Sequence, residues 1–152
     1  LTLKRPLHVR FIELMPIGVS NSWAAERFVP AAEIAEAINK RLGQLLPVKK
    51  PKGEGPAKYY QLKNAEGTIG FITSMSEHFC GRCNRLRLTS SGGLRPCLYD
   101  SREIDLKTPL RQGATLKEIA DLIMDAVAFK PDRHHMFEGW RDKRRVMSQI
   151  GG

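Results

Sequence analysis

The three cysteines of this chain constrain it most, because all of them fall within one short stretch of its 152 residues. Cys80 and Cys83 form a C-G-R-C turn, which places two sulfurs within reach of one centre. Cys97 follows after thirteen further residues, on the far strand of a hairpin that we expect to turn at Ser90 to Gly93. Paired strands lie about 5 Å apart, so the hairpin would bring the third sulfur to the same centre. An odd number of cysteines excludes a secreted disulfide scaffold and favours the reducing cytoplasm.

The spacing of the three thiols leaves several interpretations open. Thiolates select zinc, copper(I) or iron–sulfur clusters. Structural zinc requires four ligands, so a Cys3His zinc site would have to recruit His78, two residues before Cys80. A cluster held by three cysteines is the second interpretation, and three unligated cysteines are the third.

Arginine and leucine alternate directly after the second cysteine. The period of a strand puts Arg85 and Arg87 on one face and Leu86 and Leu88 on the other. We expect the leucines to face the core and the arginines the open side. Two guanidiniums one pleat apart beside a metal centre suit a phosphate chain, because arginine binds phosphate oxygens bidentately. Basic residues that decorate a solvated strand would produce the same pattern.

The charge balance also points to an anionic partner. Lysine and arginine total 25 against 16 aspartate and glutamate, a net charge of +9. Four lysines fall in the loop 48–58 without an interleaved aromatic residue, so we interpret this loop as a solvated connector rather than a nucleic-acid or membrane patch. No apolar run approaches the roughly 18 residues that a membrane span needs.

A nearly continuous apolar run from His8 to Met15 predicts a strand covered on both faces, as in a parallel sheet or a barrel. Arg10 and Glu13 interrupt this run, and buried charges need partners. A structural ion pair is the first interpretation of these two charges. A ligand role is the second, because the ends of barrel strands host active sites.

Local patterns predict the remaining elements. An apolar stripe of Ile34, Ile38, Leu42 and Leu45 predicts a helix that starts at Pro30 and ends at Pro47. Two strands are expected in 58–64 and 67–74, with a turn at Asn64 to Gly67 between them. A capping box of Thr115 and Glu118 predicts a further helix that stops before Pro131.

Three stretches of the chain resemble the C-terminal part of the MoaA family. They are RFIELMPIG (10–18), FITSMSEHFCGRCNRLRLTSSGGLRPCL (71–98) and MSQIGG (147–152). Members of that family are radical S-adenosylmethionine GTP 3′,8-cyclases, lyases of molybdenum cofactor (molybdopterin) biosynthesis. The resemblance implies conversion of GTP to (8S)-3′,8-cyclo-7,8-dihydroguanosine 5′-triphosphate. It also implies an N-terminal [4Fe–4S] cluster that cleaves S-adenosylmethionine and a C-terminal [4Fe–4S] cluster, held by three cysteines, with one iron open for the guanine base.

The resemblance also implies a role for individual residues. By this resemblance Cys80, Cys83 and Cys97 match the ligands of the C-terminal cluster, while Arg85, Leu86 and Arg87 match the stretch that contacts GTP. Met15 matches a position that approaches S-adenosylmethionine, and Arg10 matches a contact to the triphosphate. Gly151 and Gly152 match a tail that enters the family's active site.

The chain departs from the family in one large respect, since it has no CxxxCxxC motif and no cysteine left to form one. We therefore expect it to be inactive alone and to need the missing N-terminal radical half. The expected fold is α+β: residues 1–46 form the last strand and helix of an incomplete (β/α) barrel, and residues 47–152 form a subdomain of antiparallel strands and helices with the cluster site and the Gly-Gly tail. An open strand edge predicts a homodimer. The alternatives are a zinc-stabilised anion-binding module and a nucleic-acid-binding domain.

Overall fold

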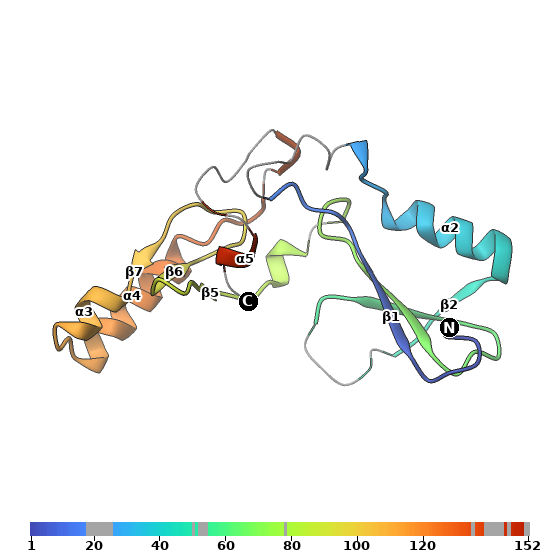
Figure 1. Cartoon of the computed structure of the whole chain (residues 1–152), viewed down its shortest axis with the longest axis horizontal. Helices are drawn as coiled ribbons and strands as arrows, with labels where there is room; N and C mark the ends of the chain where they lie inside the picture. Colours follow the sequence, from blue (N-terminus) through green and yellow to red (C-terminus); the bar gives the residue numbers. More distant parts are fainter. Residues whose placement is uncertain are drawn as a thin grey trace. The chain divides into compact units, whose positions relative to one another are not determined.

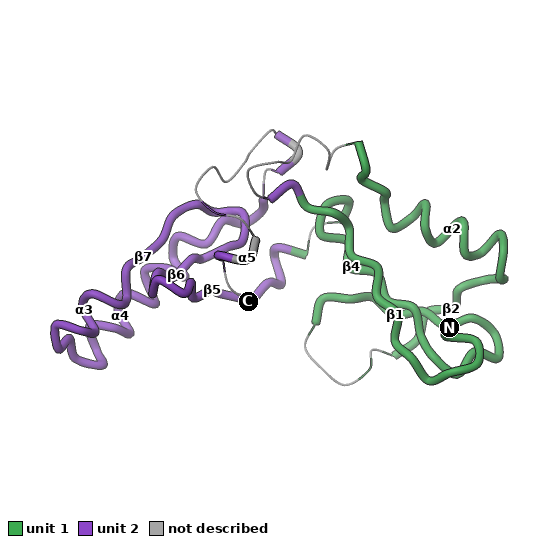
Figure 2. Tube along the Cα trace, in the orientation of Figure 1, with its two compact units in different colours: residues 1–15, 24–79 green, residues 16–23, 80–152 purple. Residues whose placement is uncertain are grey.

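The computed structural model describes residues 1–17, 26–49, 51, 55–77, 79–134, 136–138, 145 and 147–150 (Figure 1). The chain forms two compact units, residues 1–15 with 24–79 and residues 16–23 with 80–152 (Figure 2). Each unit combines helical structure with a small sheet, and this confirms the α+β class. The domain boundary expected after residue 46, at the end of the last strand and helix of an incomplete barrel, stays a prediction.

The first unit is built on a four-stranded sheet in the order β1-β4-β3-β2. Strand β1 (His8–Ile12) runs parallel to β4 (Thr68–Ile72), and the pairs β4 with β3 (Lys58–Leu62) and β3 with β2 (Leu45–Pro47) are antiparallel. The two strands expected in 58–64 and 67–74 are therefore confirmed. Asn64 makes the turn between them with a φ of 61°, a conformation that asparagine tolerates better than most residues.

Strand β1 is covered on one face only, so the expectation of cover on both faces is wrong for this chain. Its residues alternate, with His8, Arg10 and Ile12 exposed and the two residues between them partly buried. Phe11 stacks on Phe71 at 5.7 Å between ring centroids, against the core formed by the sheet and α2 (Ala31–Leu42). Ile12 remains 60% exposed because α2 packs on the other face of the sheet.

Helix α2 begins where its sequence predicts and ends five residues early. Pro30 stands in extended conformation directly before its first turn. Gly43 stops the helix with a φ of 102°, in a region that residues with a Cβ rarely adopt. Leu45 therefore lies in β2, opposite Leu62, rather than on a helical stripe that extends to Pro47.

The second unit holds a three-stranded antiparallel sheet in the order β5-β6-β7. The predicted hairpin is confirmed: β5 (Arg87–Leu88) pairs with β6 (Gly93–Arg95), which in turn pairs with β7 (Ile104–Asp105). Helix α4 begins after the predicted capping box, in which Thr115 and Glu118 satisfy each other's backbone N–H groups. The helical elements of this unit are η1 (Cys80–Arg82), α3 (Lys107–Arg111), α4 (Leu116–Ala128), η2 (Met136–Glu138) and α5 (Met147–Ile150).

Candidate functional site

The first two cysteines lie on one tight turn, as their spacing predicts. Cys80 opens the 3-10 turn η1, and the backbone N–H of Cys83 donates to the carbonyl of Cys80 at 2.9 Å. Both thiols and that of Cys97 are free and partly buried. The turn thus carries two free thiols three positions apart in the sequence.

The sulfur of Cys83 has a positively charged environment. The ammonium of Lys130 lies 3.7 Å from it, at the end of α4. Burial by itself would raise the pKa of this thiol, but hydrogen bonds from the backbone and side chain of Arg85 and the charges of Lys130 and Arg85 outweigh burial and lower the pKa. A thiol in such surroundings readily becomes the thiolate that binds metals.

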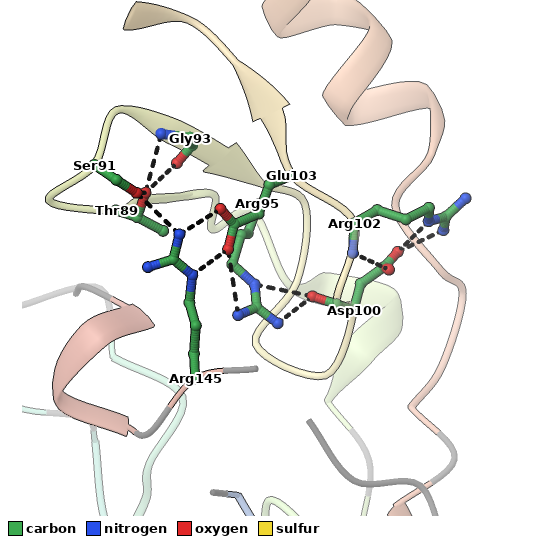
Figure 3. A network of polar contacts seen from close by, with 8 residues as sticks. All are labelled: Thr89, Ser91, Gly93, Arg95, Asp100, Arg102, Glu103 and Arg145. Carbon is green, nitrogen blue, oxygen red and sulfur yellow. Dashed lines mark hydrogen bonds and ion pairs between the residues drawn. The ribbon is translucent and has the colours of Figure 1, made fainter. Parts of the chain in front are cut away.

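Cys97 lies on the loop between β6 and β7, beyond the end of β6 at Arg95, so its expected place on the strand itself is corrected. The loop is closed by Arg95, which is 1% exposed and donates from Nε to the Asp100 carbonyl at 2.9 Å (Figure 3). Arg102 forms an ion pair with the carboxylate of Asp100, its Nε 2.8 Å from Oδ2. This network holds the short segment that carries the third cysteine.

The R-L-R stretch follows its expected orientation only in part, since Arg85 is exposed and Leu86 partly buried as expected, whereas the next two residues differ. Strand β5 contains only two residues, so Arg85 and Leu86 precede it. Leu88 is 59% exposed while Arg87 is partly buried, which is the reverse of the expected facing. So short a strand has little core to cover its leucine. Burial and the neighbouring charge of Arg85 lower the pKa of Arg87. The thiols of Cys97 and Cys83 would raise this pKa, but their effect is smaller.

This geometry allows a test of whether the site fits a metal centre. Three thiols are the right donors for an iron–sulfur cluster or zinc. Lys130 relates the segments of two of these thiols, since its Nζ lies 3.7 Å from the sulfur of Cys83 and 3.3 Å from the carbonyl oxygen of Pro96, directly before Cys97. Among the described residues, however, no three His, Cys, Asp or Glu side chains already stand together as a metal-binding group. The three thiols therefore fit an iron–sulfur cluster or zinc by the kind of donor they offer, and the described residues do not place them together as one metal-binding group.

Arg10, in β1, and Glu13, directly after it, have separate hydrogen-bond partners in the first unit. Arg10 donates from Nε to the hydroxyl of Tyr59 at 2.6 Å, and its guanidinium carbon lies 5.7 Å from the ring centroid. Glu13 is 3% exposed and accepts hydrogen bonds from the backbone N–H groups of Ala31, Met75 and Ser76. Each charge is thus satisfied by a neutral partner rather than by the structural ion pair that was the first interpretation of the sequence.

The other expected site residues fall on different parts of the chain. Met15 is partly buried and lies just beyond β1, in the first unit, whereas the cysteines and the R-L-R stretch belong to the second unit. His78, Gly151 and Gly152 lie outside the described residues.

No sequence pattern predicts two charged contacts of the second unit. Arg145 forms a two-pronged pair with Glu103, with Nε to Oε1 at 2.6 Å and Nη2 to Oε2 at 2.8 Å, and also donates to Ser91 (Figure 3). Lys130 contacts Cys83, 47 residues earlier in the chain. A lysine or arginine beyond a helix is ordinary in any basic sequence, so only the fold identifies these partners.

The fold and the site together define an α+β protein in which a basic hairpin and three free thiols are suited to a metal centre beside an anion. The family model described as Molybdenum Cofactor Synthesis C matches residues 7–136, and the chain belongs to that family. Among the described helices, none combines the length and the apolar character that crossing a bilayer requires.

Curated relatives agree with this family. The whole chain is 75% identical to a GTP 3′,8-cyclase of Pelotomaculum thermopropionicum, 60% identical to that of Desulforamulus reducens and 52% identical to that of Moorella thermoacetica. In each case the matched region is 46% of the relative's length, so the chain spans about half of these proteins.

Proposed function

We propose that this chain supplies the C-terminal half of a GTP 3′,8-cyclase and binds GTP beside a [4Fe–4S] cluster held by Cys80, Cys83 and Cys97. The names and the identity of the relatives support the reaction and the pathway. The observation that carries the site is the pair of contacts made by Lys130, whose Nζ lies 3.7 Å from the sulfur of Cys83 and 2.5 Å from the carbonyl oxygen of Arg85. A phosphate or a base held by this arginine would therefore lie near the cysteines.

The cluster, when bound, would supply an iron to which the guanine base can coordinate. The chain's own residues would bind and orient the nucleotide. Arg85 is exposed and Arg87 partly buried, so the first can reach a triphosphate in solvent and the second can hold it against the protein. Leu86, between them, is partly buried and would keep the two arginines in register.

The complete reaction requires groups outside this chain. In the proposed enzyme an N-terminal half would hold a second [4Fe–4S] cluster, which would supply the reducing electron for cleavage of S-adenosylmethionine. Met15 would approach that cofactor, and Arg10 would contact the triphosphate. Gly151 and Gly152 would extend into the active site, where a segment without side chains suits a narrow space.

The expected partners follow from the same proposal. GTP is the substrate, and neither a membrane nor a nucleic acid is needed. Strand β1 is an outer strand of the described sheet, which leaves an edge for the N-terminal half or for a second copy in a homodimer. Three free thiols suit the reducing cytoplasm.

GTP binding by the anaerobically reconstituted chain tests the assigned arginines. Charge-assisted hydrogen bonds contribute about 1.5–3 kcal/mol each, so Arg85→Ala and Arg87→Ala should each weaken GTP binding about 10- to 100-fold. Metal content should stay unchanged. Arg111→Ala is the matched control, because Arg111 is an exposed arginine at the end of α3. Equal GTP affinity in all three variants would refute the role of the R-L-R stretch.

A further inference from the structure

The ammonium group of Lys130 contacts three groups at the cysteine site. Its Nζ lies 2.5 Å from the carbonyl oxygen of Arg85, 3.3 Å from that of Pro96 and 3.7 Å from the sulfur of Cys83. An ammonium has three N–H donors, so these contacts account for its full donor capacity. Arg85 lies two residues after Cys83, and Pro96 directly precedes Cys97. Lys130 thus connects the two segments that carry the three thiols.

The backbone around Lys130 is held by the end of α4 and by the loop that carries Cys97. Its N–H donates to the carbonyl of Val127 at 3.1 Å, in the turn that follows the end of α4. Arg102 donates to the carbonyl of Phe129 at 2.8 Å and lies 5.4 Å above the ring of that residue. Asp100 in turn holds Arg102, as described above. A series of contacts that begins three residues from Cys97 therefore positions the backbone that carries this ammonium.

We propose that Lys130 is a positioning residue of the three-cysteine site: it bridges the segment of Cys83 and Arg85 to that of Pro96 and Cys97, and it places a fixed positive charge at the Cys83 sulfur. This inference rests on the proposed function for the identity of the metal centre. The bridge itself rests on the contacts alone.

Two effects follow from these contacts. The bridge restrains the approach of Cys97 to the C-G-R-C turn, and residues that orient ligands in this way typically contribute about 10- to 100-fold to metal affinity. The charge favours the more negative state of any centre bound to Cys83, because net charge and hydrogen bonds to sulfur tune the potential of iron–sulfur clusters. Removing the charge should therefore make the reduction potential more negative.

Four variants of the full chain separate charge from folding. Lys130→Met keeps an unbranched stem and removes both charge and donors, whereas Lys130→Arg keeps the charge. Nε-acetyl-lysine at position 130 keeps the stem and one N–H but removes the charge, and it serves as the second charge-free variant if Lys130→Met folds poorly. Lys117→Met is the matched control: it removes the same charge from the first turn of α4, where Lys117 pairs only at the surface with Asp121.

Hydrogen exchange on the metal-free chain tests the bridge. Lys130→Met should speed exchange in both 80–88 and 94–99, while Lys117→Met and Lys130→Arg should leave both segments near the wild-type rate. Unchanged exchange in both segments would overturn the bridge. This measurement needs no cluster, so it stays decisive even if iron reconstitution shows the proposed function to be wrong.

The charge is tested on the reconstituted chain. The midpoint potential should become more negative in Lys130→Met and in the acetyl-lysine variant, and it should stay near wild type in Lys130→Arg and Lys117→Met. Cluster retention against a chelator should fall about 10- to 100-fold in Lys130→Met. A wild-type potential in both charge-free variants would overturn the proposal. So would equal loss of the cluster in Lys130→Arg and Lys130→Met, because that would indicate a merely structural role.

Discussion

Replacing Glu13 by glutamine removes the charge of a buried carboxylate that joins three segments of the first unit. Its Oε1 accepts from the N–H of Ala31 at 3.0 Å and from the hydroxyl of Ser76 at 2.5 Å. Its Oε2 accepts from the N–H groups of Met75 and Ser76, both at 2.8 Å. The carboxylate therefore connects the end of β1 to the start of α2 and to the loop after β4.

The cost of Glu13→Gln can be worked out from these four hydrogen bonds. In its best orientation the glutamine carbonyl takes the place of Oε2, the hydroxyl of Ser76 reverses, and the N–H of Ala31 faces a donor. A buried donor without an acceptor costs about 1–3 kcal/mol. Two remaining charge-assisted bonds become neutral ones, which costs about 1 kcal/mol each on the same scale. We expect a total loss of about 3–5 kcal/mol. With a denaturant slope of about 2 kcal/mol per M, this is a fall of about 1.5–2.5 M in the urea midpoint.

The pH dependence of this stability has a definite sign. Burial by itself would raise the pKa of Glu13, but hydrogen bonds from the Ser76 side chain and from backbone N–H groups outweigh burial and lower the pKa below its ordinary value of 4.5. A lowered folded-state pKa means that the stabilisation is complete above the unfolded value and is lost as the pH falls through the folded one. The difference between wild type and Glu13→Gln should therefore narrow below about pH 4.5.

Urea unfolding followed by far-UV circular dichroism measures this difference, with Glu77→Gln as the control. Glu77 pairs with Lys58 at 2.5 Å, but both side chains are more than half exposed, and such surface pairs contribute about 0–1 kcal/mol. Equal urea midpoints for the two variants at pH 7 would contradict the predicted loss of stability, because they would mean that the buried hydrogen bonds of Glu13 contribute no more than a solvated ion pair.

Three further predictions concern the second unit. Thr115→Ala removes the capping box of α4 and should cost about 1 kcal/mol, seen as faster hydrogen exchange in the first turn of that helix. Gly92→Ala should lower the urea midpoint by about 1 M or more, because the glycine has a φ of +89° and a Cβ there would lie 2.5 Å from that of Lys107. Arg145→Gln and Glu103→Gln should each speed exchange in 147–150, and the double variant should add little in that segment, since both break the pair of Arg145 with Glu103. Glu103→Gln also removes the ion pair with Arg95.

Patterns of short range predicted their elements correctly. The capping box of α4 and both hairpins depend on residues a few positions apart, and turn chemistry decides them locally. The end of α2 was wrong for an equally local reason: the apolar stripe continues to Leu45, but Gly43 takes a positive φ and ends the helix first. An apolar period indicates which residues could line a helix, and the backbone conformation of one glycine decides where the helix stops.

Burial and long-range contacts could not be predicted in the same way. The apolar run of β1 indicated cover on two faces, yet only one layer packs on the described sheet. The leucine expected in the core at position 88 is exposed because β5 contains two residues. The spacing of Cys80, Cys83 and Cys97 identified the thiols, but the cation beside Cys83 comes from Lys130, and no period in the sequence relates positions so far apart.

Anaerobic reconstitution of the 152-residue chain with iron and sulfide, followed by metal analysis, decides whether Cys80, Cys83 and Cys97 hold an iron–sulfur cluster. We expect a brown protein with a sulfur-to-iron charge-transfer band and about four irons per chain, as a [4Fe–4S] cluster requires. Replacing Cys80, Cys83 or Cys97 by serine should abolish this uptake, whereas replacing His78 by alanine should preserve it. A colourless protein that holds one zinc per chain and loses it in the His78 variant would mean that the three cysteines form a zinc site and not a cluster.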